Sequence, residues 1–178
     1  MSSYGSKELA SAFRTVRKNT IQIAEEIPEA SYEFVAAPEV RSVARMLAHI
    51  GLATRIFQDV NKPGLISFEG FDFFGIVERS RVEQAKPRTK VEILELLRTE
   101  GEQFAAWLEA LTPEVLAEQV TEPDGKTVKS RLERLLSVKE HEMHHRGQLM
   151  LIERQLGIVP HLTRQFEELT AQMRAAKP

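Results

Sequence analysis

Cysteine is absent from the 178-residue sequence, and this absence removes several kinds of site at once. Without cysteine the chain forms no disulfide, has no thiol nucleophile and offers no sulfur ligand to a metal. Any metal ion must therefore be held by nitrogen or oxygen atoms, as in sites built from histidine and carboxylates. A cytoplasmic location is the expectation by default.

Long apolar runs and a surplus of one charge are missing as well. No stretch approaches the roughly 20 apolar residues that span a bilayer, and the residues after Met1 lack the apolar segment of a secretory signal. The formal net charge is −2 and the pI is about 6.2, whereas general nucleic-acid binders usually carry a basic surplus. We therefore expect neither a membrane nor a nucleic acid among the partners.

What is present is the composition of an ordinary globular protein, with 42% hydrophobic and 28% charged residues. This length fits a single domain with a substantial core, so we assign residues 1–178 to one domain. We find no convincing alternating pattern of a β-strand; apolar residues recur at helical spacing instead. The sequence therefore predicts an all-α protein.

Four long segments and a shorter C-terminal one have this helical periodicity, and several begin or end with a recognisable signal. Thr89-Lys90-Val91-Glu92 and Ser130-Arg131-Leu132-Glu133 match the capping box, in which two side chains satisfy free backbone N–H groups at a helix start. Gly157 suits the position just after a helix. The predicted helices run from about Glu8 to Ile27, Ser42 to Val60, Thr89 to Leu111, Ser130 to Gly157 and Thr163 to Ala175.

A long connection from Leu65 to Lys86 separates the second and third of these helices, and we predict a short helix within it. Its Phe68–Phe74 cluster could cover a pocket or a dimer face, but we favour packing of the connection onto the core. Thr112-Pro113-Glu114 predicts a short helical turn, and Pro123-Asp124-Gly125 a turn. The pattern indicates a four-helix bundle with a long connection between helices two and three and a short C-terminal helix.

Three of the five histidines cluster in His141-Glu142-Met143-His144-His145 of the fourth predicted helix. His141 and His145 are one turn apart, offset by about 40° around the axis, so their rings can converge on one ion. His144 falls outside the apolar stripe and is expected nearer solvent. His145 lies within that stripe and His141 at its edge, beside Val138, Leu149, Ile152 and Leu156.

His49 lies in the apolar stripe of the second helix, and a buried imidazole must be hydrogen-bonded or metal-bound. A single such histidine is more often a satisfied core residue than a ligand. Together with His141 and His145 it leaves two hypotheses open, a hydrogen-bonded core or one divalent ion held by all three. His161 follows the Gly157 stop and is interpreted as a loop residue.

The segment His141-Glu142-Met143-His144-His145 matches the H-E-x-x-H motif of zinc proteases, in which the glutamate is a general base. The longer metzincin form fails here, because Arg146-Gly147-Gln148-Leu149-Met150-Leu151 lacks its glycine and histidine at the required spacing. A third ligand would have to come from Glu167 or Glu168. Glu142 lies about 100° from His141 around the helix, and we slightly favour a solvated charge there. A zinc peptidase is therefore kept as an alternative.

The two histidine segments together resemble the DinB/YfiT-like family of metal-dependent bundle proteins. The resemblance is carried by Ser42-Val43-Ala44-Arg45-Met46-Leu47-Ala48-His49-Ile50, by His141-Glu142-Met143-His144-His145-Arg146-Gly147-Gln148-Leu149 and by Leu156-Gly157-Ile158-Val159-Pro160. It implies His49, His141 and His145 as the metal ligands. The family often has tryptophan just before the Ser-Val of helix two, where this chain has Arg41. This departure affects the expected pocket rim and leaves the ligands untouched.

The resemblance also implies a left-handed bundle, usually a homodimer, with one nickel or zinc ion per chain. Because some relatives use low-molecular-weight thiols and others are described as hydrolases, it implies a metal-dependent transferase or hydrolase acting on a small molecule. Three imidazoles leave an open coordination position, where an ion could activate water or a thiol.

Gln148 and Glu142 are the candidate catalytic residues, although the motif assigns neither a definite role. Gln148 lies near the ligand face and could orient bound water or substrate, and Arg45 could meet an anionic substrate. An ordinary surface role is open for both. A non-catalytic, metal-binding or stress-related dimeric module is the remaining alternative.

Overall fold

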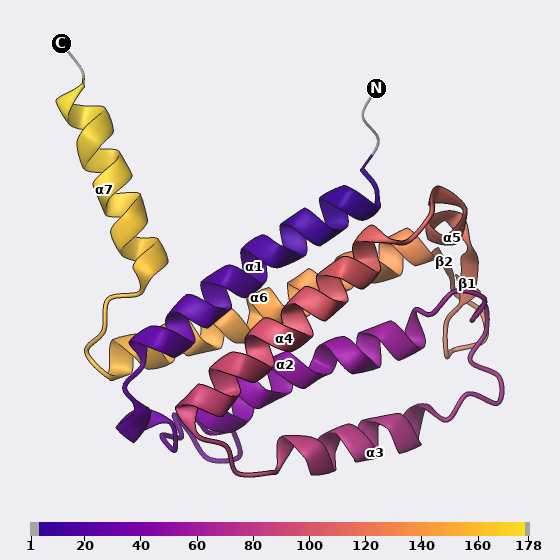
Figure 1. Ribbon diagram of the computed structural model, residues 1–178, viewed down its shortest axis with the longest axis horizontal. Coiled ribbons are helices and arrows are strands. Elements are labelled where there is room, and N and C mark those ends of the chain that lie inside the picture. The colour runs from indigo at the N-terminus through magenta and orange to yellow at the C-terminus, as the bar shows by residue number, and fades with distance from the viewer. Residues whose placement is uncertain (1–3, 177–178) are drawn as a thin grey trace.

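Helices carry most of the structure, a computed structural model that describes residues 4–176 (Figure 1). The bundle consists of α1 (Ser6–Glu26), α2 (Val43–Val60), α4 (Lys90–Glu109) and α6 (Arg131–Gln155). This arrangement confirms the predicted all-α four-helix bundle. The shorter elements are the 3₁₀ turn η1 (Glu29–Ser31), α3 (Phe73–Gln84), α5 (Pro113–Ala117) and α7 (His161–Ala175).

Local capping determines both ends of α6, the helix that carries His141 and His145. Ser130 Oγ accepts from the Glu133 backbone N–H at 3.2 Å, and Glu133 Oε2 accepts from the Ser130 N–H at 2.8 Å, so the predicted capping box is confirmed. At the other end Gly157 adopts a φ of 77°, a conformation that side-chain-bearing residues rarely take. The box predicted at Thr89 and Glu92 is also present, at the start of α4.

The long connection contains the predicted short helix, α3, which returns the chain along the outside of α2 (Figure 1). In the sequence α3 lies between α2 and α4 and returns the chain to the end of the bundle where α2 begins. As a result, α2 and α4 lie side by side and run in the same direction. No residue of α3 is fully buried. At the far end of the chain α7 leaves the bundle and buries only His161. Within residues 4–176, no helix combines the length and the apolar character that crossing a membrane requires.

The apolar core is divided into two clusters along the bundle axis. One gathers residues such as Ile23, Leu47 and Leu97 from one half of the helices, and the other includes Phe13 and Phe104 from the opposite half. Between the two clusters, α1, α4 and α6 carry polar residues, and several of these are buried. These are Arg17, Thr20, Glu100, Glu142 and His145.

A short hairpin of β1 (Gln119–Thr121) and β2 (Val128–Ser130) precedes α6, with Val120 opposite Lys129. The sequence analysis did not find these strands, because three residues are too short to show an alternating pattern. The predicted turn is present: Asp124 Oδ1 accepts from the backbone N–H groups of Lys126 and Thr127 at 2.9 and 2.8 Å.

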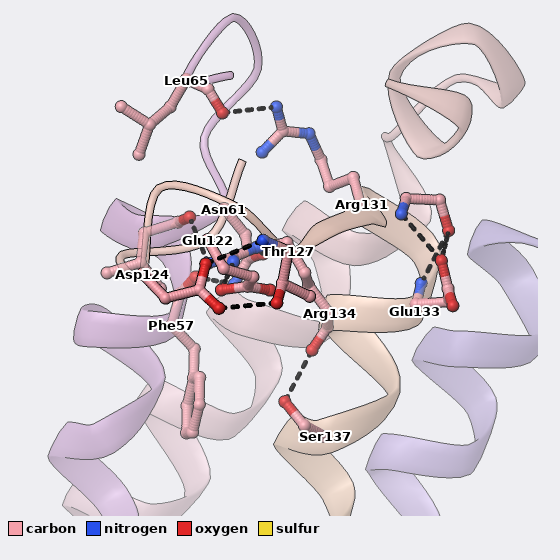
Figure 2. A network of polar contacts seen from close by, with 12 residues as sticks. Phe57, Asn61, Leu65, Glu122, Asp124, Thr127, Arg131, Glu133, Arg134 and Ser137 are labelled. Carbon is pink, nitrogen blue, oxygen red and sulfur yellow. Dashed lines mark hydrogen bonds and ion pairs between the residues drawn. The ribbon is translucent and has the colours of Figure 1, made fainter. Parts of the chain in front are cut away.

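A polar network ties this hairpin to the bundle (Figure 2). The Arg134 guanidinium on α6 donates to Asn61 Oδ1 at 3.0 Å, just beyond α2, and to Glu122 Oε2 at 2.5 Å in the hairpin. Nearby, Arg131 donates to the Leu65 carbonyl at 3.1 Å. These contacts fix the end of α2 against the beginning of α6, the two helices that carry the histidines of interest.

The Phe68–Phe74 segment lies apart from both core clusters. Phe68 and Phe71 are half-buried, with the Arg134 guanidinium 4.9 Å from the Phe68 ring centroid. Phe73 and Phe74 are exposed, the latter by 84%. All four line an open groove of about 680 Å³ beside the hairpin turn. The interpretation that this segment packs onto the core was therefore wrong for Phe73 and Phe74, which begin a helix whose apolar residues are too sparse to bury.

Candidate metal centre

Three histidines from two helices meet in the middle of the bundle. His49 comes from α2, and His141 and His145 from successive turns of α6. The ring centroids are 5.0 Å apart for His49 and His141, 4.8 Å for His49 and His145, and 4.7 Å for His141 and His145. One nitrogen from each ring lies within 4.8 Å of the others, so the group could hold a metal ion.

The approach of two of these rings fits a shared cation. His49 Nε2 lies 3.1 Å from His141 Nε2. Two ring nitrogens at this distance either form a hydrogen bond, in which one N–H donates to the lone pair of the other, or bind the same ion through their lone pairs. Zinc–nitrogen bonds of about 2.0–2.1 Å in a tetrahedral site would place two ligand nitrogens roughly 3.3 Å apart. The observed spacing of this pair is therefore close to that of a zinc-like site.

Burial keeps these imidazoles neutral at pH 7. It lowers the pKa of His49 to about 4, with a smaller contribution from the positive charge of Arg41. Burial also lowers the pKa of His141 to about 4, followed by the effect of the His145 ring. The pKa of His145 is likewise lowered, again mainly by burial. Neutral rings offer the lone pairs that metal coordination needs.

Two glutamines contact two of the three rings, those of His49 and His145, and determine which ring nitrogen carries the hydrogen. Gln84 Oε1, on α3, lies 3.1 Å from His49 Nδ1, and Gln148 Oε1 lies 2.8 Å from His145 Nδ1. Because an amide oxygen can only accept, each Nδ1 carries the hydrogen and each Nε2 keeps its lone pair. Such partners commonly orient metal-bound histidines. Gln84 was missed by the sequence analysis, since nothing local links α3 to His49.

Gln148 and His144 also take definite positions. The Gln148 amide oxygen contacts the His145 ring, and its Nε2 lies 3.4 Å from His144 Nε2. This places Gln148 beside His145; its orientation of water or substrate stays a prediction. His144 is exposed, as expected.

Glu142 is buried in an ion pair, so the interpretation of this residue as a solvated charge was wrong. Its side chain is 3% exposed, and it accepts from Arg17 Nε at 2.9 Å and from Arg17 Nη2 at 3.0 Å. The offset of about 100° from His141 turns it towards α1, where Arg17 supplies the opposite charge. With both carboxylate oxygens bound by one guanidinium, Glu142 is poorly placed to take a proton from water.

Arg17 also contacts the two other bundle helices. It donates to the Leu97 carbonyl on α4 at 2.8 Å and to the Ile50 carbonyl on α2 at 3.2 Å. Ile50 follows His49, and Glu142 follows His141, so this single side chain contacts the neighbours of two histidines. Gly101 makes room for it, since a Cβ there would lie 2.8 Å from Arg17 Cγ.

The sequence analysis missed Arg17, although two signals were present. Arg17 lies four residues after Phe13 and so continues the apolar stripe of its helix. Gly101 is similarly placed four residues after Leu97, and a glycine within a helix stripe often marks a close approach.

The remaining candidate ligands lie apart from the three histidines. His161 begins α7 rather than lying in a loop, because the chain resumes a helix directly after Pro160; the loop interpretation was wrong. It is buried, with Nε2 3.4 Å from Asn19 Oδ1. Glu167 and Glu168 are exposed on α7 and do not join the histidine group.

A cavity of about 380 Å³ opens beside His145. Its walls include the apolar side chains of Met46 and Ile152, and His145 and Gln148 line the same cavity. Arg41 lines the same cavity, in line with the expectation that this position belongs to the pocket rim. Of the three histidines, His145 is thus the one that this cavity reaches.

Comparison with known proteins identifies relatives of this chain. It is 28% identical over 154 residues to the uncharacterized protein YjoA of Bacillus subtilis, across 85% of this chain and 91% of the relative. The crystal structure of YjoA, a DinB-like protein, matches with 25% identity and a TM-score of 0.62 over 84% of this chain and 92% of that one.

Two further solved structures share the fold at lower identity. A DinB-like protein from Bacillus cereus has a TM-score of 0.66 at 17% identity, over 86% of this chain and 93% of that one. YfiT from Bacillus subtilis, described as a probable metal-dependent hydrolase with an unusual four-helix bundle topology, has a TM-score of 0.63 at 16% identity, over 89% and 91%. The family model described as DinB family matches residues 1–175. With the fold and nearly the whole length of the sequence in agreement, this chain belongs to the DinB family.

Proposed function

We propose that this protein binds one divalent metal ion, nickel or zinc, through His49, His141 and His145, and uses it to transform a small molecule. The observation that carries the proposal is the convergence of one nitrogen from each ring within 4.8 Å. The glutamine contacts to two of the rings support it, since they leave Nε2 of His49 and His145 available. The description of YfiT, which shares the fold, as a probable metal-dependent hydrolase points the same way.

Three protein ligands leave at least one coordination position open, as in catalytic rather than structural sites. When bound, the ion would act as a Lewis acid that activates water or a thiol. The chain's own contribution is to hold the imidazoles neutral and oriented, and to offer a cavity of about 380 Å³ beside His145. That volume suits a small substrate. Hydrolysis and transfer to a low-molecular-weight thiol are the two reactions that this arrangement supports.

Metal content tests the proposal directly. We would load untagged protein with nickel or zinc, remove excess metal and count bound ions by elemental mass spectrometry. About one ion per chain is expected in the wild type, with loss in His49→Ala and His145→Ala. His144→Ala is the matched control, because His144 lies on the same helix but is exposed. An unloaded wild type, or equal loss in the control, would contradict the proposal.

A zinc peptidase that uses Glu142 is the less favoured alternative, because Arg17 binds both oxygens of that carboxylate. We expect the metal-loaded protein to leave a mixed peptide library intact. Cleavage that disappears in Glu142→Gln while the metal is retained would restore the peptidase hypothesis. Metal binding without turnover of any ester, amide or thiol-acceptor substrate would instead favour the non-catalytic module.

A further inference from the structure

The cavity beside His145 combines apolar walls with one cationic side chain near the candidate metal centre. Met46, Leu151 and Ile152 supply apolar surface, and Arg41 and Gln148 supply polar groups. A pocket of this composition suits a ligand with a short carbon skeleton and a polar group. The charge of that polar group can be inferred from the surroundings of Arg41.

Arg41 has no carboxylate partner among the ion pairs of residues 4–176. Glu39 lines the same cavity but does not pair with it. Partial burial lowers the pKa of Arg41, and repulsion from Arg45 and Arg81 lowers it further. The guanidinium is thus repelled by two like charges and keeps its hydrogen-bond donors available to a ligand.

Two further arginines, Arg45 and Arg81, are close enough to Arg41 to repel its charge. Arg45 lies one turn before His49 on α2, and Arg81 lies one turn before Gln84 on α3. The positive charge of Arg41 adds to the effect of burial in lowering the pKa of His49, His141 and His145. A divalent ion held by neutral imidazoles would add to this positive potential. A negatively charged ligand is favoured in such a field, and a cationic one is disfavoured.

We propose that the small molecule bound here is an anion, whose carboxylate or similar group meets Arg41 while its reacting group reaches the metal position beside His145. The planar guanidinium can bind a carboxylate through two parallel hydrogen bonds. The apolar walls of Met46 and Ile152 accommodate the carbon skeleton between the two ends. This inference rests on the proposed function, because the metal ion anchors the other end of the ligand.

Two thiols that differ chiefly in charge test the inference. We would load the protein with cobalt, whose visible spectrum reports ligand coordination, and titrate it with 3-mercaptopropionate or 2-mercaptoethanol. Wild type should bind the anionic thiol roughly tenfold or more tightly than the neutral one, as charge-assisted hydrogen bonds imply. Arg41→Gln should lose this preference and keep its affinity for 2-mercaptoethanol. Arg174→Gln, an equal change of charge at an exposed position on α7, should behave as wild type.

The outcomes separate this inference from the proposed function. If cobalt binds but wild type shows no preference, or if the preference survives in Arg41→Gln, the inference is overturned and the metal centre stands. The same holds if cobalt binds and neither thiol coordinates it. If cobalt is not taken up at all, both proposals fail.

Discussion

The burial of individual imidazoles governs how tightly the centre can hold a metal as the pH changes. Proton and metal compete for the same lone pair, so a ligand with a low pKa keeps its metal in more acidic solution. His49 and His141, each with a pKa of about 4, differ in this respect from an ordinary histidine. Their half-buried positions between α2 and α6 are the cause.

We therefore expect zinc affinity to change by less than about threefold between pH 7 and pH 6, where ordinary histidines with a pKa near 6.5 begin to be protonated. The affinity should fall steeply only as the pH approaches 4, because these two rings then take up protons. Equilibrium dialysis followed by elemental analysis would measure it. A tenfold loss by pH 6 would show that the rings titrate normally.

In the metal-free protein the same lowered pKa values of His49 and His141 make the stability of the fold depend on pH. They favour folding above pH 6.5, and that stabilisation is lost as the pH falls towards 4.

The buried ion pair of Arg17 and Glu142 should contribute strongly to the stability of the bundle. Arg17→Met leaves Glu142 charged and without its partner, which should destabilise the fold by about 3–5 kcal/mol. Replacing both residues with methionine should recover much of that loss, since no buried charge is then left unpaired. Urea unfolding of the single and double variants would measure both effects.

Arg14→Met serves as the control for this experiment. Arg14 lies on the same helix and pairs with Glu102 and Glu109, but all three side chains are more than a third exposed. Exposed pairs contribute roughly 0–1 kcal/mol, so a small effect is expected. Similar losses for Arg14→Met and Arg17→Met would mean that burial of the Arg17 pair is not what stabilises the bundle.

At the level of elements, the sequence predicted what local signals encode. The capping boxes at Thr89 and Ser130 placed the starts of α4 and α6, and Gly157 placed the end of α6. The hairpin was missed because its pairing joins residues on either side of a turn, and each strand alone is too short to show a pattern.

In the candidate site as well, the sequence predicted what the pattern within one helix encodes and missed contacts between helices. The one-turn spacing of His141 and His145 and the stripe position of His49 indicated their meeting, because helical periodicity places side chains on a face. Gln84 and Arg17 act across helix interfaces, through His49 and Glu142, and periodicity within one helix cannot identify such partners. The metal, the homodimer and the cytoplasmic location stay predictions.

The corner between α6 and α7 contains a buried carboxyl group that should make stability depend on pH. Burial raises the pKa of Glu153 to about 7, with a further contribution from Glu26 and opposing ones from Arg164 and Arg154. Neither of its carboxyl oxygens has a hydrogen-bond partner within residues 4–176. The folded state therefore favours the protonated form, and stability should fall as the pH rises from about 4.5 to 7.

Glu153→Gln removes the charge with little change of shape. We expect it to stabilise the protein by about 1–3 kcal/mol above pH 8, where wild type must bury a charge, and to have little effect near pH 5. Guanidinium unfolding at the two pH values would measure this. Glu140→Gln, at an exposed position of the same helix, should have no such pH-dependent effect. A uniform shift at both pH values would count against a buried, titrating Glu153.

For the whole molecule, a bound ion would connect helices that are distant in sequence. His49 on α2 and His141 on α6 are 92 residues apart, and the intervening chain passes through α3, α4, α5 and the hairpin. Because the unfolded chain would not hold these residues together, metal binding should stabilise the folded bundle as a whole.

Free metal at about 100 times the dissociation constant should stabilise the protein by about 2.7 kcal/mol. For a chain of this length, that corresponds to a rise of roughly 5–10 °C in Tm. Calorimetry with and without zinc would measure it, and a chelator should reverse the shift. His144→Ala should respond as wild type, whereas His49→Ala should not respond; an equal response in both would argue for metal binding elsewhere.

The polar layer around Arg17 also has a consequence for how the helices are aligned. The notch at Gly101, the Leu97 and Ile50 carbonyls and the Glu142 carboxylate all lie at one height along the bundle. If α1 slid by a single turn, about 5.4 Å, the guanidinium would face apolar side chains with its charge unpaired. Arg17 thus fixes the position of α1 along the bundle axis. Because Arg17 contacts the neighbours of His49 and His141, the alignment of these two histidines depends in part on α1, a helix that contributes none of the three histidines.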